Sequence, residues 1–201
     1  MLTLLEKEPI QYQTMITLLV YTGIRRGELC GLEWKDIDFE NQVMHVVRSA
    51  QYIGNKTMIT KEPKTKSGIR HFSLSIHACI LLKKYKRWQL EQKLNAGDRW
   101  EESDRLFTSW NGKPIHPDTV TDWFSKFIKR SGLPYVTLHS LRHTNATLMI
   151  AEGTDVCTVS RRLGHANTAT TLNIYAHALK SKDREAANTL DNVLEYHAKI
   201  S

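Results

Sequence analysis

The stretch Thr22-Gly23-Ile24-Arg25-Arg26-Gly27-Glu28-Leu29 lies between two predicted helices near the start of the 201-residue chain. Apolar residues recur at helical spacing over residues 10–20, which predicts a helix that ends at Thr22-Gly23. A second, shorter helix is predicted to begin at Gly27. The two arginines therefore stand where one helix ends and the next begins, a position that suits a binding or catalytic role as well as a structural one.

A small antiparallel sheet is predicted after these helices. β-branched residues indicate a strand at 43–48, and further strands at 56–60 and 69–75 flank a polar, turn-forming segment. That segment, Pro63-Lys64-Thr65-Lys66-Ser67-Gly68, predicts a basic loop between two strands.

Helical patterns dominate the remainder of the chain. The predicted helices cover residues 76–95, 118–130, 140–152, 155–163, 170–178 and 183–197, with Asp118 as an expected cap and Gly153 and Gly164 as expected stops. The sequence therefore predicts an α+β domain, mainly helical, with one small antiparallel sheet.

Composition limits the class of protein and of partner. The chain has a formal charge of +7 and 41% hydrophobic residues, which is typical of a globular domain that binds a polyanion. Its three cysteines form no CxxC pair, so neither a zinc ribbon nor a disulfide framework is indicated. No apolar run approaches the ~20 residues that a membrane span needs. We expect a cytoplasmic protein with no membrane partner.

Three further segments carry groups able to do chemistry: His139-Ser140-Leu141-Arg142-His143-Thr144, Leu163-Gly164-His165 and Tyr175-Ala176-His177. Cleaving a phosphodiester without a metal requires fixed donors to the phosphate oxygens, a group that moves protons and a nucleophile. Guanidinium groups suit the first task, imidazole and ammonium groups the second, and a phenol beside cations the third. The chain carries a complete set of these groups.

Each segment also has a plain structural explanation. The arginines after Gly23 fit solvated charges at a helix start, and the lysines fit the tip of a hairpin. Leu163-Gly164 is an ordinary helix stop, and Tyr175 alone is typical of a packed aromatic residue. The joint occurrence of the segments, in this order and spacing, favours a catalytic function.

Taken together, the segments resemble the catalytic domain of the tyrosine recombinase, or phage integrase, family, most like integrases of phages and conjugative transposons. The resemblance places the family's catalytic residues at six positions, with Lys66 preferred to Lys64 for the lysine: Arg25, Lys66, His139, Arg142, His165 and Tyr175. We further expect four residues to contact DNA, namely Arg26, Lys64, Arg70 and His143.

The resemblance implies a recombinase that cleaves and rejoins double-stranded DNA through a 3′-phosphotyrosine, with no metal or other cofactor. It implies a catalytic domain at 1–180 and a helical tail at 181–201 that packs in cis or in trans, with the family's upstream core-binding and arm-binding domains absent. A monomer is expected in isolation and a homotetramer in the DNA synapse, with accessory directionality and DNA-bending proteins. The protein is expected to be encoded by a bacterial or phage gene and to act on the nucleoid in the cytoplasm of a bacterial cell.

Three other functions remain open on the sequence. A metal hydrolase would use His139 and His143, which are four residues apart, but the glutamate of a His-Glu-x-x-His pair is missing. A DNA-binding module without chemistry would need no intact set of reactive groups. A type IB topoisomerase shares the chemistry, although the Leu163-Gly164-His165 segment and the short chain favour a recombinase.

Overall fold

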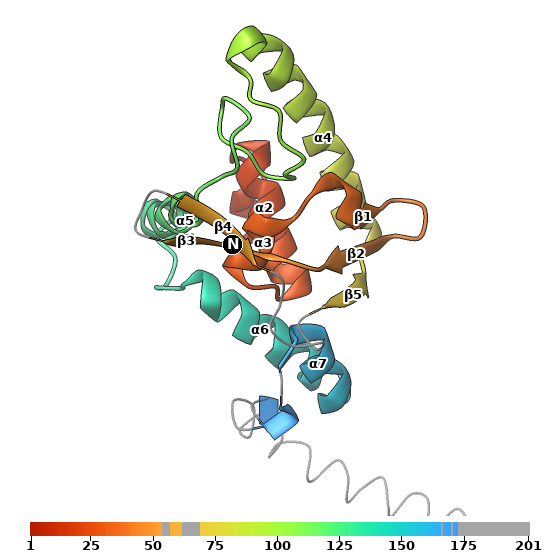
Figure 1. Cartoon of the computed structure of the whole chain (residues 1–201). Coiled ribbons are helices and arrows are strands. Elements are labelled where there is room, and N and C mark those ends of the chain that lie inside the picture. Colours follow the sequence, from red (N-terminus) through yellow and green to blue (C-terminus); the bar gives the residue numbers. More distant parts are fainter. Residues whose placement is uncertain (54–56, 62–68, 166, 170, 173–201) are drawn as a thin grey trace, which may run out of the picture.

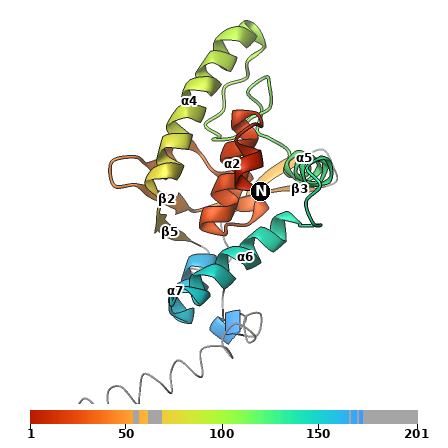
Figure 2. The same ribbon diagram turned by 180° about the vertical axis from the view of Figure 1, so that it is seen from behind.

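The computed structural model describes residues 1–53, 57–61, 69–165, 167–169 and 171–172. A buried helix, α2 (Ile10–Thr22), lies in the middle, with α4 (Ile76–Ala96) on one side and α5 (Pro117–Arg130) on the other (Figures 1 and 2). Seven residues of α2 are buried, including Met15, Ile16 and Leu18. The helix therefore forms the centre of the core.

The other helices are shorter. They are α1 (Leu2–Leu5), α3 (Arg26–Gly31), α6 (Leu138–Ala151), α7 (Val156–Leu163) and the 3₁₀ turns η1 (Trp34–Asp36) and η3 (Gly97–Arg99). Helix α3 follows α2 after the sharp turn at Gly23, whose φ of 65° is left-handed and suits glycine.

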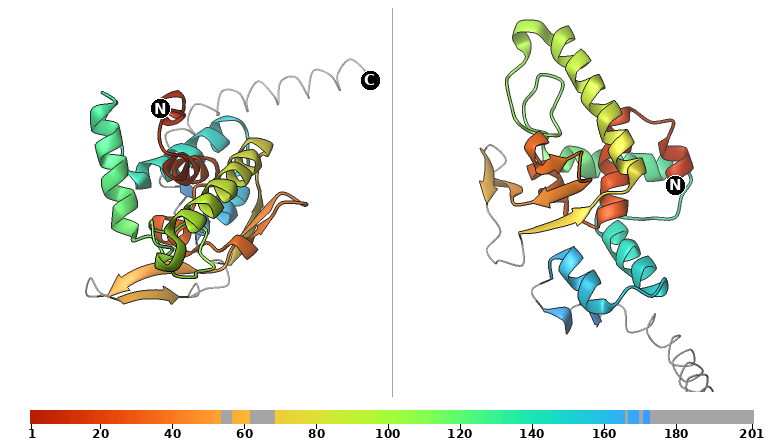
Figure 3. Two further views of the ribbon diagram at one scale, coloured as in Figure 1. Left: turned by 90° about the horizontal axis from the view of Figure 1, so that it is seen from above. Right: turned by 90° about the vertical axis from the view of Figure 1, so that its right-hand side faces the viewer.

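The described strands form two antiparallel sheets on one side of the helices (Figure 3). In the first, β2 (Val43–Val46) lies between β1 (Ile37–Asp38) and β5 (Arg70–Ser73), with Met44 opposite Phe72. In the second, β3 (Ser49–Ile53) pairs with β4 (Thr57–Lys61). Residues 62–68, between β4 and β5, lie outside the described residues, and they include Lys64 and Lys66.

Helices α6 and α7 lie beyond the end of α2, apart from α4 and the upper loops (Figure 1). A small apolar cluster of Ala146, Ile150, Val159 and Leu163 joins them to each other. Helix α6 also packs against α2, and α7 against β5. These contacts bring the end of α7 close to the turn between α2 and α3.

The expected fold class is confirmed, and so are the helices now labelled α2, α4, α6 and α7. The strands form two sheets where one was expected. The difference lies in β3, which was not predicted and which pairs with β4 apart from β1, β2 and β5. The cap of α5 is His116, whose Nδ1 accepts the Asp118 N–H at 3.1 Å, and not Asp118. The helices predicted at 170–178 and 183–197 lie outside the described residues, apart from Thr171 and Leu172. Within the described part, no helix has the length and hydrophobicity of a membrane span.

Candidate active site

The site is built around the C-terminal end of α7. The helix begins at Asp155, whose side chain accepts the Thr158 N–H at 2.9 Å, and it ends at Gly164, whose φ of 66° is left-handed. A helix end leaves its last carbonyl groups without partners inside the helix. Positive side chains are favoured there, because the carbonyls also form the negative end of the helix dipole.

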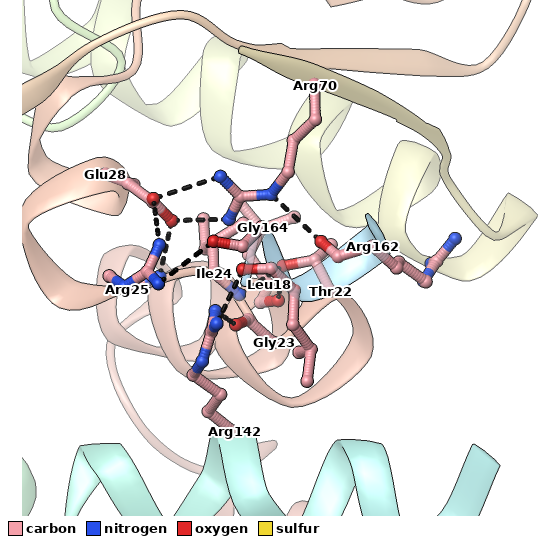
Figure 4. A network of polar contacts seen from close by, with 11 residues as sticks. Leu18, Thr22, Gly23, Ile24, Arg25, Glu28, Arg70, Arg142, Arg162 and Gly164 are labelled. Carbon is pink, nitrogen blue, oxygen red and sulfur yellow. Dashed lines mark hydrogen bonds and ion pairs between the residues drawn. The ribbon is translucent and has the colours of Figure 1, made fainter. Parts of the chain in front are cut away.

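Three arginines from three separate segments bind three successive carbonyl oxygens at this helix end (Figure 4). Arg70 Nε donates to Arg162 O at 2.9 Å, Arg142 Nη2 to Leu163 O at 2.5 Å, and Arg25 Nη2 to Gly164 O at 3.2 Å. The end of α7 therefore gathers guanidinium groups that are far apart in the sequence, directly before His165.

Arg142 is held rigidly. It lies on α6, only 4% of its surface is exposed, and its Nη1 donates to Gly23 O at 2.6 Å while Nη2 binds Leu163 O. The two carbonyls belong to the ends of α2 and α7, so they fix the plane of the guanidinium. A guanidinium carries five N–H groups, so bonds to carbonyls are compatible with binding a phosphate as well.

Arg25 is more accessible, because 47% of its side chain is exposed. It is the residue before α3, and Glu28 fixes it twice: Oε2 accepts the Arg25 backbone N–H at 2.8 Å, and Oε1 accepts Nη1 at 2.9 Å. Helix α3 in turn lies directly on β3. A Cβ on Gly27 would come within 2.9 Å of Ala50 O, so only glycine allows this approach.

His165 follows the helix end and faces the same group of cations. Its Nδ1 lies 2.8 Å from Oγ1 of the fully buried Thr171. Burial, followed by the charges of Arg142 and Arg25, lowers the pKa of His165 to about 4. The imidazole is therefore neutral at pH 7, and it offers one donor and one acceptor nitrogen.

The two histidines of α6 lie side by side. The rings of His139 and His143 meet edge to face with centroids 4.5 Å apart, and His139 is exposed. Burial, then His139 and Arg142, lower the pKa of His143. Among the described residues, no three histidine, cysteine or acidic side chains gather as metal ligands. A metal bound by His139 and His143 would thus have no third described ligand of these types.

The remaining expected site residues fall into two groups. Arg26 turns toward α5, where its Nη1 pairs with Asp118 at 2.8 Å and bonds Thr121 at 2.7 Å. Lys64, Lys66 and Tyr175 lie outside the described residues. The structure thus brings Arg25, Arg142 and His165 together. It also places His143 close enough to affect the pKa of His165.

Arg70 is largely buried. This residue, one of the four expected to contact DNA, is only 8% exposed, and its guanidinium binds the buried carboxylate of Glu28. The physical reason is that Glu28 is itself only 6% exposed and needs a positive partner.

Sequence reasoning also missed two residues of the site, Glu28 and Thr171. A signal existed for Glu28, because a glutamate three residues after a helix start commonly accepts the backbone N–H at that start. No comparable sequence signal exists for Thr171, because its contact with His165 depends on how the chain continues after α7.

The whole arrangement suits an anion. Three guanidinium groups gather at the end of α7 with one carboxylate, that of Glu28, which pairs with Arg25 and Arg70. Positive charge is therefore in excess, and the neutral imidazole beside them is a hydrogen-bonding group. Preorganised donors of this kind stabilise the charge that develops on phosphoryl oxygens during transfer.

Comparison with known families and proteins gives a consistent result. The model of the "Phage integrase family" matches residues 1–182. The ICEBs1 integrase of Bacillus subtilis (strain 168) is 32% identical over 193 residues, which cover 96% of this chain and 52% of the relative. A "Tyrosine recombinase XerC-like" protein of Caldanaerobacter subterraneus subsp. tengcongensis is 35% identical over 192 residues, which cover 90% of this chain and 49% of the relative. The chain thus spans about half the length of these relatives.

Two solved structures share the fold. The Tn1549 transposon integrase in complex with transposon right end DNA has a TM-score of 0.81 and 27% identity, with 94% of this chain and 62% of that chain covered. The XerA recombinase has a TM-score of 0.70 and 26% identity, with 91% and 61% covered.

Proposed function

Because the chain belongs to the phage integrase family, we propose that it carries the cleaving and rejoining centre of a site-specific DNA recombinase. The observation that supports this most is the gathering of Arg25, Arg142 and His165 at the end of α7. We infer that the element it serves is a prophage or a mobile element, since one relative is an integrase named ICEBs1 and another is a transposon integrase bound to DNA.

In the proposed reaction the two arginines hold the non-bridging oxygens of one phosphate in duplex DNA. The hydroxyl of Tyr175 attacks phosphorus, the new P–O bond forms as the bond to O5′ breaks, and a 3′-phosphotyrosine results. Lys66, with Lys64 as the alternative, gives a proton to the departing 5′-oxygen. The reverse attack by a 5′-hydroxyl rejoins DNA, and no ATP is consumed because the covalent link conserves the bond.

The histidines take two different roles in this proposal. His139 assists the loss of the proton from Tyr175. His165, neutral at pH 7 because its pKa lies near 4, donates a hydrogen bond to the phosphate from Nε2. That tautomer requires Nδ1 to accept from the Thr171 hydroxyl, which lies 2.8 Å away.

The proposal extends to the partners of the chain. Double-stranded DNA is the substrate, four copies form the synapse, and an isolated copy is a monomer. Accessory proteins that bend DNA or set direction act with them, on the nucleoid in the cytoplasm. Residues 1–180 form the catalytic domain in this proposal, and residues 181–201 form a tail that docks in cis or on a neighbouring copy.

Covalent capture of nicked DNA tests the proposed function. Duplexes taken from the sequences that flank the gene are nicked next to each candidate cleavage position, so that the cleaved fragment diffuses away and the adduct persists. In buffer containing EDTA, we expect a protein–DNA adduct that survives denaturation, because the donors are arginines and not a metal ion. An adduct that forms only after Mg²⁺ is added, or none on any duplex, would contradict the proposal.

A further inference from the structure

Arg70 has a set of contacts that the proposed mechanism does not use. It lies on β5, and its guanidinium makes a two-pronged ion pair with Glu28: Nη1 to Oε1 at 3.0 Å and Nη2 to Oε2 at 2.6 Å. Its third nitrogen, Nε, donates to Arg162 O at 2.9 Å. One side chain thus ties β5 to both α3 and α7.

Glu28, held by Arg70, in turn restrains Arg25. The same two carboxylate oxygens that bind Arg70 also accept the side chain of Arg25 at 2.9 Å and its backbone N–H at 2.8 Å. Figure 4 shows Glu28 between the two arginines, with Arg25 reaching on to Gly164. The carboxylate is therefore shared by one buried and one half-exposed guanidinium.

The Arg70 guanidinium lies beside Gly164, in space that is open because glycine has no side chain. A Cβ at Gly164 would lie 2.9 Å from Arg70 Nη1 and 3.0 Å from its Cζ, and the φ of 66° also disfavours any other residue. The carbonyl of this same residue accepts the hydrogen bond from Arg25 at 3.2 Å. Arg70 therefore packs against the turn whose carbonyl accepts a hydrogen bond from the Arg25 side chain.

We propose that Arg70 is a positioning residue, which holds Glu28 charged and in place so that Glu28 sets the plane of Arg25 toward the phosphate. The inference rests on the proposed function for its effect on cleavage. Arg70 touches no substrate in this account, because it is only 8% exposed. It acts through Glu28.

The charge of Glu28 depends on this pair. Burial is the largest influence on its pKa and raises it, but the hydrogen bond and charge of Arg70, followed by Arg25, hold the pKa below its ordinary value. The charged groups acting on Glu28 are thus Arg70 from β5 and Arg25 beside its own helix. His165, after the end of α7, is close enough to Arg142 on α6 and to Arg25 and Arg70 for their charges to lower its pKa.

The direction of the pH effect follows from these influences. A carboxyl whose pKa is depressed in the folded state contributes stability above its unfolded pKa, and this is lost as pH falls through the folded pKa. Without Arg70, burial is opposed by Arg25 alone, so the pKa of Glu28 rises. Glu28 then takes up its proton at a higher pH, and a neutral carboxyl orients Arg25 less firmly.

Single-turnover cleavage of a nicked duplex, at saturating protein and at pH 6 and pH 8, tests the inference. For Arg70→Gln we expect cleavage about 100-fold slower than wild type, since misplacing a donor by about 1 Å is that costly, with the larger loss at the lower pH. DNA affinity is expected to change by less than about twofold, because phosphate contacts at the surface remain.

Three further variants separate positioning from folding. Glu28→Gln is expected to be slow at both pH values with no extra loss at pH 6, because nothing remains to titrate. Arg70→Lys keeps the charge but loses the two-pronged geometry, so we expect a smaller loss of about 5-fold and no pH step. Arg48→Gln is the matched control, because Arg48 is also largely buried and pairs with Asp36 at 2.5 Å. The Arg48→Gln variant is expected to be less stable than wild type, but the ratio of its cleavage rates at pH 6 and pH 8 should equal the wild-type ratio.

The orientation of Arg25 is read independently of cleavage by the Nε–Hε NMR signal of its side chain. We expect the signal to shift in Arg70→Gln and to stay in place in Arg48→Gln. An unmoved signal, or cleavage by Arg70→Gln at close to the wild-type rate at both pH values, would overturn the inference. If wild-type protein forms no adduct, the proposed function fails, and the NMR signal still decides whether Arg70 positions Arg25.

Discussion

Replacing Tyr175 by phenylalanine is expected to abolish the covalent protein–DNA adduct while leaving DNA binding within about twofold of wild type. The substitution removes only the hydroxyl that would attack phosphorus, and none of the arginines that would hold the phosphate. Because no other group in the proposed reaction forms the covalent bond, adduct formation should fall below detection. The measurement is a denaturing gel of nicked, labelled DNA, with affinity measured in parallel by fluorescence anisotropy.

Tyr135→Phe provides the matched control for this experiment. Tyr135 is 87% exposed and lies in the connection between α5 and α6, so its hydroxyl has no part in the proposed reaction. Its variant should form adduct at the wild-type rate. A Tyr175→Phe protein that still becomes linked to DNA would show that another residue is the nucleophile.

The second large effect is expected at Arg142. Replacing it by alanine removes a donor aimed at the phosphate, and we expect the cleavage rate to fall by about 10²–10³-fold, as when an oxyanion donor is removed. The same change leaves the carbonyls of Gly23 and Leu163 without a bond that the structure gives them. Each loss costs about 1–3 kcal/mol of unfolding free energy if water does not replace the donor.

The two consequences of Arg142→Ala are separated by measuring urea unfolding and single-turnover cleavage on the same protein. Cleavage is measured at a temperature where the variant is still folded, and Arg48→Ala serves as a control that breaks a buried ion pair elsewhere. Arg48→Ala is expected to lose stability and to retain its cleavage rate within about threefold, because it lies outside the proposed phosphate site. Cleavage by folded Arg142→Ala at close to the wild-type rate would refute its assignment.

The long helices were predictable because their signals are local. Apolar spacing marks α2 and α4, and for α7 an aspartate that caps the start and a left-handed glycine at the end fix both boundaries. β3 escaped prediction because Ser49-Ala50-Gln51-Tyr52 has little β-branched character, and its burial against Gly27 and Gly31 depends on the tertiary fold. Pairing with β4 is what makes it a strand.

For the site, the sequence indicated the types of residue and their order along the chain. It did not indicate which side chains are exposed in the fold and which are buried. Arg25 and Arg70 are both arginines beside loops, yet one is half-exposed and the other is buried. The difference arises because Glu28 is buried and draws Arg70 inward across 42 positions of sequence. The low pKa of His165 has a similar origin, since burial and the nearby arginines exist only in the folded chain.

The most direct test of the central claim is the crystal structure of the trapped adduct with nicked DNA. The account predicts that phosphorus is bonded to Tyr175 Oη and that nitrogens of Arg25 and Arg142 lie about 3 Å from its non-bridging oxygens. It also predicts that Arg70 remains on Glu28. A phosphate bound away from the end of α7, with neither Arg25 nor Arg142 in contact with its oxygens, would contradict it.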